Sequence, residues 1–277
     1  MCIRDRGLRA DLLDARLKQL HAAGRLRRVK LLYVCSYFDN PAGLTLSARR
    51  RRQIVEVVRR WRKKQRFYIL EDAAYRDLAY DAAADVPSMK TFDQANDLVI
   101  LTQTFSKSLS PGLKTGYGFL PGELLGPIMD QKAGHDFGSA NFNQHLAYWL
   151  LASGRADRHL QRLREAYRPK RDAILEALER HVGPLAAADG VAWTRPAGGL
   201  YVWLTLPSRV NTDLDGSLFR RALEKGVIYV PGSYCYYSER GFNIPRNHMR
   251  LSFGVPSVDD NREGIRRLAE AIAEELG

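Results

Sequence analysis

Cysteine is scarce in this chain of 277 residues, which holds only Cys2, Cys35 and Cys235. Three scattered cysteines exclude a disulfide framework, and without a CxxC pair or an HExxH motif we expect no metal site. Long apolar runs are also missing, and none approaches the roughly 18 uncharged residues that a membrane span needs. The N-terminus has no apolar core of a signal peptide, so we expect a cytoplasmic protein with no membrane partner.

Acidic residues are outnumbered, with 31 Asp and Glu against 43 Lys and Arg, which gives a formal net charge of +12. A hydrophobic share of 45% is that of an ordinary globular chain and excludes disorder. The basic excess gathers in residues 49–66, where Ile54, Val55, Val58 and Trp61 recur at helical spacing. This spacing favours an amphipathic surface helix with a solvated basic face, and a nucleic-acid partner is the less favoured interpretation.

The first six residues, Met1 to Arg6, need a separate explanation. The codons ATG TGT ATA AGA GAC AGG, which resemble the end of a transposon-type sequencing adapter, translate as this hexapeptide. We therefore expect residues 1–6 to be a non-native scar, and the native chain to enter at Gly7 in mid-protein. A genuine start at Met1 is the alternative.

The order of the elements indicates an α/β protein. A helix over residues 10–23 precedes a strand over 30–38 and the basic helix over 47–64, and short apolar strands follow at 67–70 and 98–102. The strands lie about 30 residues apart, the length of a βαβ crossover. We predict a mainly parallel, doubly wound sheet covered by helices on both faces.

The pattern changes near Gly154. A long Arg-rich helix over residues 155–181 leads into short strands and a closing helix over 258–276. We expect two domains: a partial large cofactor-binding domain over residues 1–154 and a small C-terminal α+β domain over 155–277. The strands predicted in the second domain are 193–196, 199–206, 227–230 and 249–253.

Polar residues follow three of the predicted strands. In parallel sheets the ligand crevice lies outside the carboxyl ends of the strands, so these residues are the first candidates for a site. Asn40 follows the first strand, Glu71 and Asp72 end the second, and Lys107 follows the third. An amide, a carboxylate and an amine at three strand ends can converge on one small molecule, although each alone is typical of ordinary turns.

Together these residues resemble the fold-type I pyridoxal-phosphate aminotransferases of class I/II, over essentially the whole chain from about Leu8. The shared motifs appear in family order: Asn-Pro-x-Gly at Asn40, Asp-x-x-Tyr at Asp72, Ser-Lys at Ser106, Gly-Gly-Leu-Tyr-Val-Trp at Gly198 and Arg-Leu-Ser-Phe at Arg250. The tracts at 37–41 and 71–75 look most like the branch with 2-aminoadipate and broad-specificity aminotransferases.

The resemblance implies a catalytic role for Lys107, which would form a Schiff base with pyridoxal 5'-phosphate and then act as general base and acid. Asp72 would hold the proton of the pyridine nitrogen, since an opposite charge favours that protonated form. Glu71 cannot share this task because adjacent strand residues face opposite sides. Asn40 and Tyr75 would donate hydrogen bonds to the phenolic oxygen of the cofactor.

For the cofactor phosphate, the resemblance implies the hydroxyls of Thr104 and Ser106 together with Lys114. This lysine stands where an arginine is usual in the family, and it supplies a point charge without a bidentate fork. Arg250 matches the arginine that grips the substrate carboxylate, with Asn40 beside it as a second substrate-binding residue. Tyr201 and Trp203 are expected to pack within the small domain.

Two functions from different classes remain open. The first is an aminotransferase, truncated at its N-terminus, that exchanges the amino group between an amino acid and a 2-oxo acid such as 2-oxoglutarate and forms a homodimer. The second is the aminotransferase-like effector domain of a winged-helix transcription regulator, which binds the same cofactor to sense rather than to turn over. The upstream gene sequence would discriminate between them best.

Overall fold

The computed structural model describes residues 7–81, 86–187, 190–238 and 241–277, and the chain divides into two compact units. The first unit holds Met1–Asp39 and Leu44–Arg164, and the second holds Asn40–Gly43 and Glu165–Gly277. The predicted scar at residues 1–6 lies outside the described residues. The predicted domain ranges, 1–154 and 155–277, stay a prediction.

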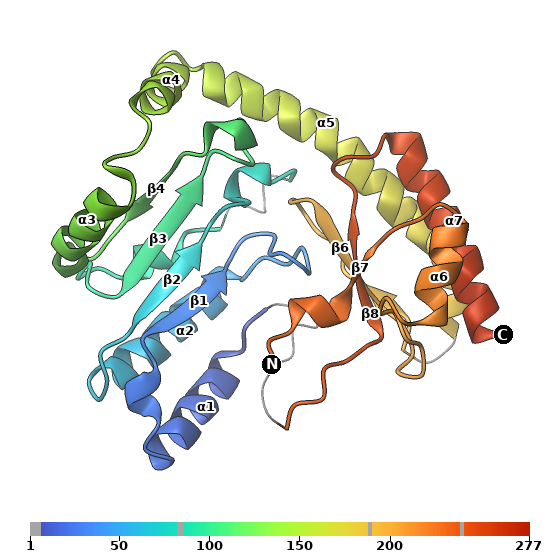
Figure 1. Ribbon diagram of the computed structural model, residues 1–277, viewed down its shortest axis with the longest axis horizontal. Coiled ribbons are helices and arrows are strands. Elements are labelled where there is room, and N and C mark those ends of the chain that lie inside the picture. The colour runs from blue at the N-terminus through green and yellow to red at the C-terminus, as the bar shows by residue number, and fades with distance from the viewer. Residues whose placement is uncertain (1–6, 82–85, 188–189, 239–240) are drawn as a thin grey trace. The chain divides into compact units, whose positions relative to one another are not determined.

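The sheet of the first unit has the strand order β1-β2-β3-β4 (Figure 1). β1 (Leu31–Cys35), β2 (Tyr68–Asp72) and β3 (Val99–Thr104) are parallel, while β4 (Gly116–Phe119) pairs antiparallel with β3. The prediction of a mainly parallel sheet is confirmed. β4 was not predicted, because two of its four residues are glycine and the strand is exposed.

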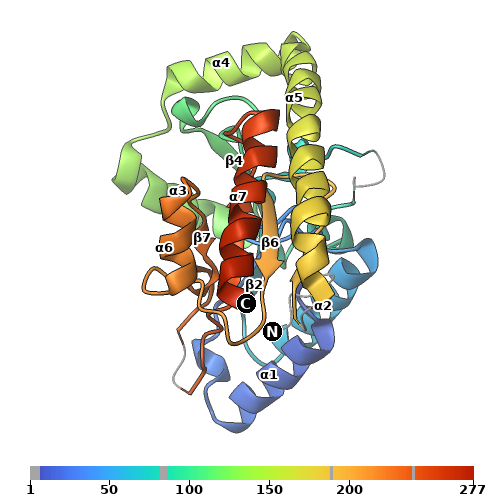
Figure 2. The ribbon, with the colours of Figure 1, turned by 90° about the vertical axis from the view of Figure 1, so that its right-hand side faces the viewer.

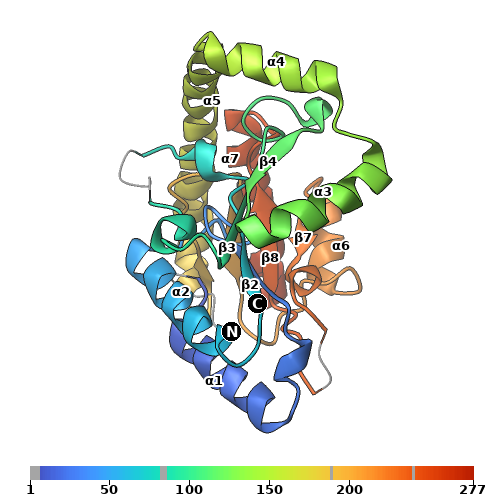
Figure 3. The ribbon, with the colours of Figure 1, turned by 90° about the vertical axis from the view of Figure 1, so that its left-hand side faces the viewer.

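One face of this sheet carries the core of the first unit. The helices α1 (Ala10–Ala22) and α2 (Ala48–Arg62) lie together on this side of the strands (Figure 3). Val34, Ile69 and Val99 point into this core and are at most 5% exposed. On the opposite face Leu31 and Tyr33 remain 45% and 59% exposed, so the described helices cover the two faces unequally.

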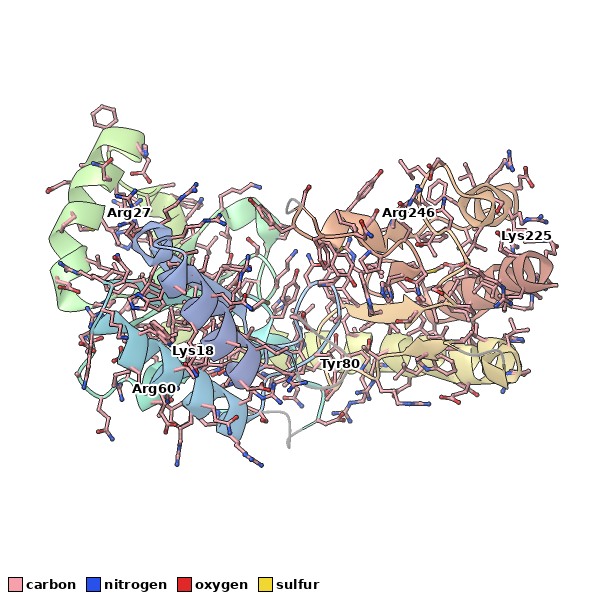
Figure 4. The ribbon with its side chains drawn as sticks, turned by 90° about the horizontal axis from the view of Figure 1, so that it is seen from below. Lys18, Arg27, Arg60, Tyr80, Lys225 and Arg246 are labelled. Atoms are coloured by element: carbon pink, nitrogen blue, oxygen red, sulfur yellow. The ribbon has the colours of Figure 1, made fainter. Side chains whose placement is uncertain are left out.

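α2 is amphipathic, as its sequence predicts. Ser47 caps its first turn by accepting a hydrogen bond from the Arg50 amide, and the side chains expected to be apolar contacts are buried: Ile54, Val55, Val58 and Trp61. Arg60 of α2 and Lys18 of the neighbouring α1 are largely exposed (Figure 4). One expectation is wrong, because Arg51 is wholly buried rather than part of the solvated basic face.

The first unit continues through short helical turns and two helices that the sequence did not predict. The helices are α3 (Gly122–Asp136) and α4 (Asn141–Ala152), and the turns are η1 (Leu26–Arg28), η2 (Arg76–Leu78), η4 (Met89–Phe92) and η5 (Pro111–Leu113). The long α5 (Arg155–Ala177) follows, near its predicted place, and the boundary between the two units falls within it, after Arg164. None of the helices in the described residues is both long and apolar enough to cross a membrane.

The second unit is built on an antiparallel sheet with the order β5-β6-β8-β7. Its strands are β5 (Ala192–Trp193), β6 (Tyr201–Thr205), β7 (Val230–Pro231) and β8 (His248–Ser252). The helices α6 (Ser217–Glu224) and α7 (Val258–Leu276) lie side by side (Figure 2). The turns are η6 (Leu178–Val182), η7 (Gly183–Ala187) and η8 (Gly232–Cys235).

A four-residue excursion, Asn40–Gly43, belongs to the second unit although it interrupts the first. Asp39 and Leu44 close its base, since the Asp39 amide donates to the Leu44 carbonyl at 2.9 Å and the Leu44 amide donates to Asp39 Oδ1 at 2.7 Å. Gly43 has a φ of +69°, and a Cβ there would lie 2.4 Å from the Tyr201 carbonyl oxygen. Only glycine fits this position without strain.

Candidate active site

Asp72 ends β2 at the carboxyl edge of the parallel strands. Its two oxygens accept hydrogen bonds from different neutral donors: Tyr33 Oη donates to Oδ2 at 2.7 Å, and the Ala74 amide donates to Oδ1 at 3.0 Å. Within the described ranges no Lys, Arg or His side chain forms an ion pair with Asp72. The result is a half-buried carboxylate that is oriented but not neutralised.

Glu71 lies on the other face of the same strand and is fully buried. Its carboxylate pairs with Arg51 Nη1 at 3.1 Å and accepts from Ser36 Oγ at 2.6 Å, from the Met89 amide at 3.0 Å and from Ser88 Oγ. The prediction that Glu71 and Asp72 face opposite sides is therefore correct. The Glu71 carboxylate is paired with a cation inside the core, whereas the Asp72 carboxylate has only neutral donors among the described residues.

Lys107 follows β3 in a turn and is half-buried. Its Nζ lies 5.8 Å from the ring centroid of Tyr75, within the range of a cation–π contact. Tyr75 is 7% exposed and immediately precedes η2. In the part of the chain that the structure describes, the Lys107 amine has no carboxylate partner.

Two hydroxyls and a lysine gather at the same end of the sheet. Thr104 Oγ1 and Ser106 Oγ are 3.0 Å apart, and the Ser106 amide donates to Thr104 Oγ1 at 3.1 Å. Thr104 pairs with Gly116 of β4, so Lys114, two residues earlier, stands at this end as well. Lys114 is exposed and has a φ of +47°.

Asn143 of α4 supports the segment that carries Lys114. Its Nδ2 donates to the Leu113 carbonyl at 2.8 Å, one residue before Lys114. The sequence gives no signal for this contact, since the two residues are 30 positions apart and Asn143 lies in a helix that was not predicted.

In the second unit, Arg250 of β8 and Asn40 form a separate polar pair. Arg250 Nη1 donates to Asn40 Oδ1 at 2.6 Å, and the guanidinium carbon lies 4.5 Å from the ring centroid of Tyr201. Arg250 Nε is buried and has no hydrogen-bond partner among the described residues. Tyr201 was expected only to pack within the small domain, so its contact with this arginine is a feature that sequence reasoning missed.

The fold defines an α/β protein with polar side chains at the ends of its parallel strands, and comparison with known proteins identifies its family. The family model described as "Aminotransferase class I and II" matches residues 3–272. The chain belongs to this family of pyridoxal-phosphate-dependent enzymes, and the sequence-based recognition is confirmed.

Relatives within the family are aminotransferases of several specificities. Aromatic-amino-acid aminotransferase 1 of Thermococcus litoralis is 36% identical over 98% of this chain and 60% of its own length. The 2-aminoadipate transaminase of Thermus thermophilus is 34% identical over 92% of this chain and 60% of its own length. Proteins described as HTH-type transcriptional regulators also match, at 32% identity or less and over 49% of their length.

Among solved structures, the multiple substrate aminotransferase of Thermococcus profundus has a TM-score of 0.87 at 38% identity. The match covers 98% of this chain and 62% of that protein. The predicted aminotransferase fold is confirmed. The chain spans about 60% of the length of the aminotransferases that it matches.

Proposed function

We propose that this protein is a transaminase that moves an amino group between an amino acid and a 2-oxo acid, with 2-oxoglutarate as the expected acceptor. One observation carries the proposal. Asp72 and Lys107 stand at the carboxyl ends of neighbouring parallel strands, and neither is neutralised by an opposite charge in the described chain. A carboxylate and an amine kept in this state are suited to a ligand with a cationic ring nitrogen and a carbonyl carbon.

Pyridoxal phosphate fits this pair of residues. When bound, it supplies an electron sink for the charge that develops on the substrate Cα. The Asp72 carboxylate holds the proton at the pyridine nitrogen, because an adjacent negative charge favours the protonated form. Lys107 would hold the cofactor covalently through Nζ and, once released, would carry the proton between the substrate Cα and the cofactor carbon as general base and acid.

The phosphate end is assigned to the cluster beside β4. The hydroxyls of Thr104 and Ser106 can donate hydrogen bonds to phosphate oxygens, and Lys114 supplies a positive charge. Tyr75, packed near Lys107, is assigned to the phenolic oxygen of the cofactor. The predicted cofactor contact of Asn40 stays a prediction.

Arg250 and Asn40 are assigned to the substrate carboxylate. A guanidinium is a planar fork that binds a carboxylate through two parallel hydrogen bonds. The Tyr201 ring fixes the plane of this guanidinium, and Arg250 Nη1 already donates a hydrogen bond to Asn40 Oδ1 at 2.6 Å. The buried, unpartnered Nε retains a donor for an incoming carboxylate oxygen.

The test of this function is covalent cofactor capture followed by turnover. Lys107→Ala should abolish the visible absorbance of the bound cofactor and its fixation by borohydride, whereas Lys132→Ala, at an ion-paired lysine of α3, should preserve both. Retention of a reducible linkage in Lys107→Ala would refute its role. Asp72→Ala should lower turnover by several orders of magnitude, because the lost electrostatic stabilisation amounts to several kcal/mol.

Turnover also separates the two classes of function. Amino transfer from aromatic, branched or 2-aminoadipate donors to 2-oxoglutarate would support a transaminase. Cofactor binding without transfer from any donor would favour the effector domain of a regulator, which matches at lower identity.

The proposal extends to the oligomeric state and the cellular location of the protein. We expect a twofold homodimer in the cytoplasm, and symmetric dimers are the commonest soluble oligomers. Sedimentation that showed an active monomer would contradict this part.

A further inference from the structure

We propose that Tyr33 is a positioning residue, which fixes the orientation of the Asp72 carboxylate so that this group meets the ring nitrogen of the cofactor. The inference rests on the proposed function and deepens it, since no motif of the chain points to Tyr33. Its basis is the hydrogen bond from Tyr33 Oη to Asp72 Oδ2.

The sheet register brings the two side chains to the same face. Cys35 of β1 lies opposite Asp72 of β2, and Tyr33 precedes Cys35 by two residues, so its side chain points to the same side as that of Asp72. Tyr33 itself lies opposite Leu70, so its phenol reaches Asp72 diagonally across the two strands. The resulting oxygen–oxygen distance of 2.7 Å is that of a well-formed hydrogen bond from a hydroxyl donor.

The two donors to Asp72 hold different oxygens. The Ala74 amide binds Oδ1 and the Tyr33 hydroxyl binds Oδ2, so rotation of the carboxylate would break both hydrogen bonds. Each carboxylate oxygen can accept more than one hydrogen bond, so a further donor can still bind. The plane of the carboxylate is therefore set before any ligand arrives.

The chemical nature of the donor matters as much as its place. The ordinary pKa of a phenol, about 10, already keeps the Tyr33 hydroxyl neutral at physiological pH. Partial desolvation, together with the hydrogen bond to Asp72, raises this pKa further. A neutral donor orients the carboxylate without cancelling its charge. Arg51 does the opposite for Glu71, where the cation compensates the carboxylate.

Tyr33 contributes little to the core by comparison. Its side chain is 59% exposed on the less covered face of the sheet. Replacement by phenylalanine removes only the hydroxyl and keeps the ring, so Tyr33→Phe is expected to fold. Tyr117→Phe is a matched control, because Tyr117 is 42% exposed on β4 of the same sheet.

The experiment compares binding of pyridoxal phosphate with that of its 1-deaza analogue, which has a carbon in place of the ring nitrogen. Tyr33→Phe should weaken binding of pyridoxal phosphate about three- to tenfold and leave binding of the analogue unchanged, while Tyr117→Phe should change neither. In the Asp72→Ala background, Tyr33→Phe should have no further effect, since it acts through that carboxylate.

The failure of this inference is distinguishable from failure of the proposed function. Equal weakening of both ligands, or an undiminished effect of Tyr33→Phe in Asp72→Ala, would overturn the role of Tyr33 alone. No covalent capture of pyridoxal phosphate by the unmodified protein would overturn the proposed function, and the inference with it.

Discussion

The buried pair of Arg51 and Glu71 offers a sharp test of what holds the first unit together. Both side chains are completely buried, and Arg51 also donates to the carbonyls of Leu46 at 2.8 Å and Ser36 at 2.7 Å. Its guanidinium lies 3.9 Å from the ring centroid of Tyr37. Arg51→Met keeps most of the apolar stem of the side chain but removes all of these donors.

The expected cost follows from the charge that remains. Without Arg51, the Glu71 carboxylate would keep only its neutral donors inside the core, and breaking a buried pair in this way typically costs about 3–5 kcal/mol. A whole domain is stable by only about 5–15 kcal/mol. With a urea dependence of about 1–3 kcal/mol per M, the midpoint of unfolding should fall by at least about 1 M.

The assay is urea unfolding followed by circular dichroism, with Arg49→Met as the matched control. Arg49 is exposed on the same helix, and its replacement should change the free energy of unfolding by no more than about 0.5 kcal/mol. The double variant Arg51→Met/Glu71→Gln should be more stable than the sum of the single effects by about 1–3 kcal/mol. Equal midpoints for Arg51→Met and Arg49→Met would refute the argument.

Three further predictions concern single side chains. Burial raises the pKa of Asp93, but hydrogen bonds from the Val99 and Leu98 amides outweigh this effect, and the net result is a lowered pKa. The ionised Asp93 therefore stabilises the fold above the unfolded pKa of about 3.9, and this stabilisation is lost as the pH falls through the pKa of the folded state. Asp93→Asn should therefore flatten the loss of stability below about pH 4 in urea titrations, and an unchanged pH slope would contradict this. Lys114→Arg should tighten cofactor binding roughly three- to tenfold by adding a bidentate phosphate contact, and an unchanged Kd would argue against a phosphate role. Arg250→Lys should raise KM for the amino acid about 10- to 100-fold with a smaller change in kcat, while an unaltered KM would remove Arg250 from the substrate site.

The sequence predicted the elements whose signal is local. The strands β1, β2 and β3 are apolar runs, and the buried stripe of α2 follows from its spacing. β4 escaped prediction because Gly116 and Gly118 have low strand propensity, and its pairing with β3 supplies the hydrogen bonds that decide its conformation.

In the candidate site, too, local motifs could be recognised in the sequence, whereas contacts between distant residues could not. Motifs of the chain mark Asp72 and Lys107 as candidates for the site, but they do not indicate which side chains contact them in the fold. Arg51 reads as one more surface cation of a basic helix, because its partner Glu71 is 20 positions away. Tyr33 reads as an ordinary strand residue, since only the register of β1 on β2 brings it to Asp72.

The excursion Asn40–Gly43 makes the second unit discontinuous in sequence. An expressed fragment that began at Glu165 would lack Asn40, the hydrogen-bond partner of Arg250, and would leave the space beside the Tyr201 carbonyl that Gly43 occupies unfilled. Neither unit can therefore be obtained intact by a single cut of the chain. Exchange of the second unit between homologues would have to graft two separate segments, and the short one carries one member of the Asn40–Arg250 pair.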